Sequence, residues 1–210
     1  MTIHAALKEK VDWKAGTDAD DCLAFNLVEY GGMERFRRIF DGFKYGELPQ
    51  HFIGSGGLHT NYDPSRAPAG RHTFYMNMLV PFDLKDGGAA KWDEIKESFA
   101  DWALEHTARF ANNLNAETIL ARYVESPLDF IRHTPSFQRG DIMGLGSYIY
   151  QSLGMRPTPE LAQYRVPGAN GLYLCGPFMH PGGGITGGGR PVAIRIMEDL
   201  KLDYSKVIRA

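Results

Sequence analysis

The sequence of 210 residues predicts an α/β (α+β) protein, because segments with the spacing of strands and segments with the spacing of helices both occur along it. Residues 74–82 form the clearest strand, with apolar side chains on both faces, which predicts that the sheet is covered on both sides. Residues 33–43 and 91–112 carry apolar side chains at helical spacing. Within each segment, polar residues separate the apolar ones, so both segments predict amphipathic helices.

The remaining elements follow from the same patterns. Residues 2–7, 51–53 and 118–124 are predicted as strands, and a further apolar run covers residues 22–30. The glycines of residues 54–57 begin a long turn. Ser126, Pro127 and Asp129 have the spacing of a helix start, with a capping serine and an acid three residues later. Arg35, Arg37 and Arg38 are interpreted as the solvated side of the first helix.

Composition excludes several classes of function. A hydrophobic content of 43 % and a net charge of -2 are those of a globular domain without an electrostatic footprint for nucleic acid. Cys22 and Cys175 are too few for a disulfide framework or a thiolate metal site, and no metal is assigned. We expect a cytoplasmic protein with neither a leader peptide nor a transmembrane segment.

The most informative feature is the distribution of the 24 glycines, six of which fall within residues 182–189. An apolar run at residues 172–175 precedes them and predicts a buried strand, and residues 191–200 predict a helix directly after them. A glycine-rich loop before a helix N-terminus suits an anion or a polarised ring edge. Gly182, Gly184 and Gly187 match the dinucleotide fingerprint, but the strand that this fingerprint requires has no room before Ala210.

Residues 171–193, GLYLCGPFMHPGGGITGGGRPVA, resemble the C-terminal flavin-binding signature of the phytoene-desaturase-like FAD-dependent oxidoreductases. Within that group the resemblance is greatest to the branch that includes pyridine nucleotide-disulfide oxidoreductase domain-containing protein 2. Residues 63–72, DPSRAPAGRH, are similar to a second stretch in the family's substrate domain, and residues 167–171 also fit.

The resemblance implies two domains. Residues 1–166 would form a substrate-binding domain with a mixed β-sheet and covering helices. Residues 167–210 would supply a strand, a flavin-binding loop and a helix that complete a Rossmann-like FAD domain. The implied FAD-binding residues are Gly176, Pro177, Gly182, Gly183, Gly184, Ile185, Thr186 and Gly187. His180 is the best catalytic candidate, although a role in bracing the loop explains it equally well.

The family's N-terminal GxGxxG half does not occur in this sequence. We therefore expect a second polypeptide to carry that half, as in a naturally split enzyme, although removal of that half would explain the sequence as well. The expected activity is oxidation of a C–H bond in a small apolar organic substrate, by a subunit that is inactive without its partner. The alternatives are a non-catalytic binding or assembly subunit, and a homo-oligomer whose loop binds another phosphate-bearing ligand.

Overall fold

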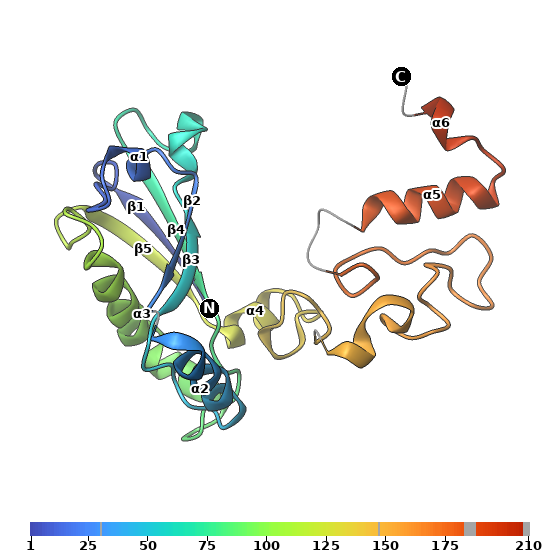
Figure 1. Ribbon diagram of the computed structural model, residues 1–210, viewed down its shortest axis with the longest axis horizontal. Helices are drawn as coiled ribbons and strands as arrows, with labels where there is room; N and C mark the ends of the chain where they lie inside the picture. Colours follow the sequence, from blue (N-terminus) through green and yellow to red (C-terminus); the bar gives the residue numbers. More distant parts are fainter. Residues whose placement is uncertain (30, 147, 183–187, 208–210) are drawn as a thin grey trace. The chain divides into compact units, whose positions relative to one another are not determined.

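The computed structural model describes residues 1–29, 31–146, 148–182 and 188–207. The chain divides into two compact units, residues 1–133 and residues 134–210 (Figure 1). The domain boundary predicted after residue 166 separates proposed roles in substrate and FAD binding, not compact units, and it stays a prediction. No helix of the described residues has the length and apolarity that a membrane span requires.

The first unit is built on a five-stranded sheet, which confirms the predicted α/β class. Its strands are β1 (Thr2–Leu7), β2 (Ala24–Val28), β3 (Ile53–Gly57), β4 (His72–Met78) and β5 (Ile119–Glu125), in the order β2-β3-β4-β1-β5. Every described pairing of these strands is antiparallel, where the sequence predicted a mixed sheet. An antiparallel sheet can bury one face and leave the other open. In this sheet the buried face is the one that packs against a helix.

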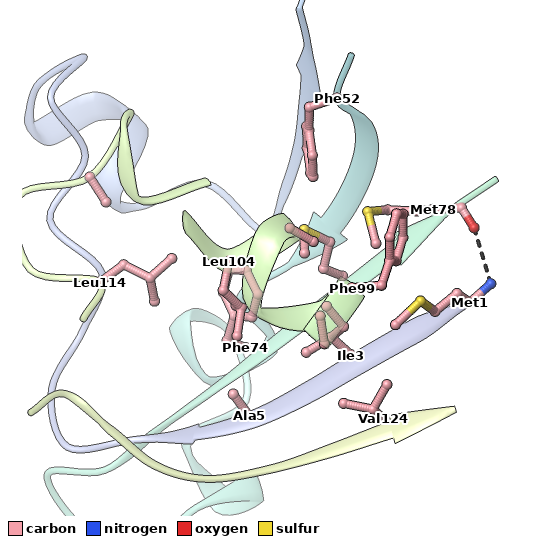
Figure 2. Close-up of a cluster of buried hydrophobic side chains, with 14 of the residues drawn as sticks. Met1, Ile3, Ala5, Phe52, Phe74, Met78, Phe99, Leu104, Leu114 and Val124 are labelled. Carbon is pink, nitrogen blue, oxygen red and sulfur yellow. Dashed lines mark hydrogen bonds between the residues drawn. The ribbon is translucent and has the colours of Figure 1, made fainter. Parts of the chain in front are cut away.

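The hydrophobic core lies between the buried face of the sheet and α3 (Trp92–Ala108), as Figure 2 shows. The buried side of β1 contributes Ile3, Ala5 and Leu7, because alternate residues of a strand point to the same face. Thr107 on α3 donates a hydrogen bond from Oγ1 to Met76 Sδ on β4 at 3.4 Å. The contact ties the helix directly to the middle of the sheet.

The glycines of residues 54–57 lie within β3, so the predicted turn at this position is wrong. A Cβ on Gly56 would collide with the carbonyl oxygen of Tyr75 and with the Phe25 ring. Close aromatic packing across the sheet therefore requires glycine here, a reason that strand propensity does not contain.

The other helices of this unit are α1 (Thr17–Asp20), α2 (Gly32–Lys44) and α4 (Pro127–His133). The predicted capping of α4 is confirmed. Ser126 Oγ accepts a hydrogen bond from the Asp129 backbone N–H at 3.2 Å, while Asp129 Oδ2 accepts one from the Ser126 N–H at 3.0 Å. Both partners thereby satisfy amide groups that a helix start leaves without a partner.

The second unit has short helical turns followed by α5 (Gly189–Asp199) and α6 (Tyr204–Val207). The predicted helix after the glycines is confirmed, but the buried strand at residues 172–175 is wrong. Tyr173 forms one isolated antiparallel bridge with Arg165, and Leu172 is 51 % exposed. A strand needs neighbouring strands for its backbone hydrogen bonds, and the described residues of this unit supply this single bridge.

Candidate functional site

The candidate site in the second unit is anchored by a small apolar core. Met179 is fully buried in a cluster with Tyr164 and with Val192 of α5. The Tyr164 hydroxyl also donates a hydrogen bond to the carbonyl oxygen of His180 at 3.1 Å. The loop after residue 175 is therefore fixed to the body of this unit at two successive residues.

The start of α5 lies against the beginning of this loop. A Cβ built on Gly188, the residue that caps the helix, would lie 3.5 Å from the carbonyl oxygen of Gly176. A helix start leaves its first N–H groups without partners inside the helix, and no side chain of the described residues caps this one. Gly176 itself has a φ of 143°, a conformation that favours glycine.

A buried arginine, which the sequence did not single out, holds the loop in place. Arg156 is 4 % exposed, and each described acceptor of its guanidinium is a backbone carbonyl oxygen. Nη2 donates to Pro177 at 2.9 Å and Nε donates to the same oxygen at 3.3 Å. The other acceptors are Met143, Leu145, Gly146 and Gln151. Multiple hydrogen bonds of this kind compensate the cost of burying the charge.

Arg156 also explains one of the predicted FAD-binding glycines. A Cβ on Gly182 would lie 2.9 Å from Arg156 Nε, closer than real Cβ contacts allow, and the φ of Gly182 is 79°. The arginine and the backbone conformation thus both require glycine at this position. The remaining predicted loop residues, Gly183, Gly184, Ile185, Thr186 and Gly187, lie outside the described residues.

His180 has one ring nitrogen that no described residue satisfies. Its Nδ1 is buried and has no hydrogen-bond partner among the residues that the structure describes. A ring nitrogen of histidine is a donor or an acceptor in every tautomer, and burying it without a partner costs free energy. The predicted catalytic candidate therefore lies in the loop with a buried ring nitrogen that no described residue satisfies.

The end of α5 is tied to the segment before the loop by an ion pair. Asp199 accepts hydrogen bonds from Arg165 Nε at 2.6 Å and from the Tyr173 hydroxyl at 2.7 Å. These two donors, with Arg165 the stronger, hold the pKa of the Asp199 carboxyl far below its usual range. Both ends of the helix are thereby positioned relative to residues 173–182.

The first unit offers a second candidate surface, the sheet face opposite α3. Strand register aligns five side chains in a polar row across the sheet: Asn26, Ser55, Asn77, Thr2 and Glu125. Ser55 Oγ donates to Asn77 Oδ1 at 2.7 Å, and Thr2 Oγ1 donates to Glu125 Oε2 at 3.3 Å. The prediction that the sheet is covered on both sides is wrong, because Asn26 and His4 on this face are exposed.

A neighbouring row on the same face is aromatic. His4 lies between Tyr75 and Tyr123 in register, with ring centroids 5.0 Å and 6.5 Å away. A groove of about 520 Å³ lies at the His4 and Tyr75 end of this row, and its lining residues are His4, His59, Arg66, Thr73, Phe74 and Tyr75. Aromatic rings beside hydrogen-bonding groups are typical of surfaces that bind small organic molecules.

Curated proteins similar to this chain include three oxidoreductase-related relatives. The chain is 26 % identical to a subunit of the limonene dehydrogenase of Castellaniella defragrans over 95 % of its own length. It is 33 % identical to pyridine nucleotide-disulfide oxidoreductase domain-containing protein 2 of Rattus norvegicus and of Mus musculus, over 69 % of its length. No protein-family model matches the chain.

The chain spans 37 % of the length of the limonene dehydrogenase subunit and 24 % of each of the other two relatives. All three names are names of oxidoreductases or dehydrogenases, and one is the name of a subunit. They support a place for this chain among oxidoreductase-related proteins.

Proposed function

We propose that the chain is part of a flavin-dependent oxidoreductase related to the phytoene-desaturase-like enzymes. In this proposal the second unit holds the ring side of FAD, and the first unit contributes a substrate surface. The observation that carries the proposal is the contact between Gly188 and Gly176, which brings the uncapped start of α5 to the glycine loop. The similarity to three oxidoreductase-related proteins supports it.

The described residues fit such a cofactor in two ways. Helix N–H groups without a capping side chain favour an electron-rich ligand, such as the carbonyl edge of a flavin ring. Gly176 and Gly182 keep the backbone at both ends of the loop free of side chains, and Gly183, Gly184 and Gly187 would let the backbone between them approach a ligand closely. His180 Nδ1 would supply a hydrogen bond to the same ligand.

The chemistry that FAD would supply when bound is hydride acceptance from a C–H bond of the substrate. The protein would position the flavin ring and the substrate and stabilise developing charge. Arg156 would hold the loop rigid at Pro177, because its guanidinium fixes that carbonyl with two hydrogen bonds. The N-terminus of α5 would stabilise negative charge that develops on the ring. The aromatic row of the first unit, with His4 at its centre, would bind a small organic substrate with apolar surface.

We further propose that the enzyme works as an assembly with a second polypeptide, which carries the half that binds the ADP part of FAD. A relative that is named as one subunit of a dehydrogenase supports a multi-chain enzyme. The second candidate function is a binding or assembly subunit that keeps this fold without cofactor. Substitution of Gly183 and Gly184 by bulkier residues distinguishes the two functions. It would leave the assembly fully functional if the chain is a binding or assembly subunit without cofactor.

The test uses the native assembly with a His180→Gln substitution, and His51→Gln as the control. If His180 binds FAD, the substitution lowers the FAD retained per folded chain by about two- to tenfold, the range for one lost hydrogen bond. The control retains FAD as the wild type does. If His180→Gln lowers the melting temperature while FAD retention per folded chain is unchanged, His180 braces the loop and its proposed binding role is wrong.

A further inference from the structure

Helix α2 carries an apolar side that its own unit does not cover. Helical spacing aligns five side chains on this side: Met33, Phe36, Ile39, Phe40 and Phe43. A helix with so strong a separation of apolar and polar residues normally buries its apolar side. Of these five, Ile39 alone is buried, while Met33 is 55 % exposed and Phe36 is 37 % exposed.

The aromatic members of this side pack on one another along the helix. The ring centroids of Phe36 and Phe40 are 5.0 Å apart, and those of Phe40 and Phe43 are 5.6 Å apart. The rings therefore form a continuous apolar strip, attached to the unit at Ile39 and open to its surroundings at Met33 and Phe36. An apolar strip of this kind on a surface marks a place of interaction.

Charge is distributed around this strip in a specific order. With about 100° of rotation per residue, Arg37 and Lys44 border one edge of the strip and Arg35 borders the other. The acidic residues Glu34 and Asp41 lie on the polar side between these edges. The helix carries four basic and two acidic residues, although the whole chain has a net charge of -2.

We propose that α2 binds the surface of an anionic phospholipid membrane. Basic side chains at both edges of an apolar strip can reach lipid phosphates while the aromatic side chains enter the boundary between headgroups and acyl chains. The 13 residues of α2 span about 20 Å, less than the ~30 Å hydrocarbon core, so the helix lies in the plane of the membrane. This role is independent of the flavin, and it would keep the enzyme where apolar molecules dissolve.

Co-sedimentation of the full chain with phospholipid vesicles tests this proposal. We expect binding to vesicles of phosphatidylcholine mixed with phosphatidylserine, weaker binding to phosphatidylcholine alone, and loss of binding at high salt. The double substitution Met33→Ser with Phe36→Ser reduces binding about tenfold or more, because it removes the two most exposed apolar side chains. Arg37→Glu reduces binding about fivefold or more.

Two matched controls change residues of the same kind elsewhere. Leu120→Ser removes an exposed apolar side chain on β5, and Lys206→Glu reverses a basic charge on α6. Both should bind vesicles as the wild type does, and circular dichroism checks that every variant is folded.

Three results would overturn the proposal. The first is a folded wild-type chain that does not sediment with the anionic vesicles. The second is vesicle binding that the substitutions in α2 leave unchanged. The third is loss of a protein partner or of self-association, rather than of vesicle binding, in the Met33→Ser, Phe36→Ser variant, which would show that protein covers the strip.

Discussion

The guanidinium of Arg156 donates two hydrogen bonds to the carbonyl oxygen of Pro177, from Nη2 at 2.9 Å and from Nε at 3.3 Å. This pair joins the irregular segment before residue 157 to the loop after residue 175, and it lies beside Gly182. The geometry of the candidate cofactor loop therefore depends on a side chain outside the predicted FAD-binding residues.

Replacing Arg156 should destabilise the second unit. Arg156→Met keeps a long side chain but leaves the buried carbonyl oxygens without their donor, which should lower the free energy of unfolding by about 2–4 kcal/mol. Lys206→Met removes an exposed basic charge and should change it by less than about 0.5 kcal/mol. Chemical denaturation measures both. Equal effects of the two substitutions would contradict the anchoring role of Arg156.

Gly182 should be sensitive to substitution for two separable reasons. Gly182→Ala combines an unfavourable φ of 79° with a Cβ contact at 2.9 Å to Arg156, whereas Gly168→Ala has a φ of 77° and open space around its Cβ. We expect Gly168→Ala to cost about 1 kcal/mol of stability and Gly182→Ala to cost more. Thermal unfolding of the two variants compares them directly. A Gly182→Ala variant as stable as Gly168→Ala would show that Arg156 moves aside without cost.

The sequence predicted the order of elements around this loop but not its support. The apolar and glycine-rich runs of residues 172–189 and the helix after them were recognisable because local composition determines them. Arg156 was not, because its acceptors are backbone carbonyls as far as 21 residues away, and a carbonyl has no sequence signal. The partly exposed segment at residues 172–175 was predicted as buried for a related reason, since burial depends on neighbours that local composition does not identify.

A glycine in β3 is constrained in a similar way within the sheet. Gly56→Ala should destabilise the first unit by more than about 3 kcal/mol, because its Cβ would meet the Tyr75 backbone and the Phe25 ring. Gly16→Ala has open space around its Cβ, and its cost comes from the positive φ of 101° alone. Hydrogen exchange of the β3 and β4 amides measures the local effect. Normal protection in Gly56→Ala would contradict this close packing.

The strands and helices of the first unit were largely predictable. Period-two and helical spacing identified β1, β4, β5, α2 and α3, because each has an apolar pattern of sufficient length. The start of α4 was identified by the spacing of Ser126, Pro127 and Asp129. β3 was misplaced because glycines carry no hydrophobic pattern, and the open sheet face was missed because Tyr75 and Leu79 are apolar in composition. In the structure Tyr75 lies on the same face as a polar row that only the register of five strands assembles.

Asp129 should make the stability of the first unit depend on pH in the acidic range. Partial burial opposes its ionisation, but hydrogen bonds from Lys96 and Ser126 prevail and lower the pKa of Asp129 to about 2. A lowered pKa in the folded state stabilises the fold above the unfolded value near 4, and this contribution is lost as pH falls to about 2.

Asp129→Asn tests this dependence. It should lower the free energy of unfolding by about 2 kcal/mol at neutral pH, and the difference from the wild type should shrink between about pH 4 and pH 2. Glu117→Gln, which changes an exposed carboxylate, should show no comparable effect. Urea denaturation across this pH range is the measurement. A difference that does not change with pH would assign the loss to helix capping alone, without the ion pair to Lys96.

The proposal that this chain forms one side of a flavin site is best tested on the cofactor of the native assembly. The assembly is purified with whatever chain accompanies this one, its absorbance spectrum is recorded, and the small molecule released on denaturation is weighed by mass spectrometry. We expect a flavin spectrum and the mass of FAD. A colourless, fully folded assembly that releases no flavin would contradict the proposal.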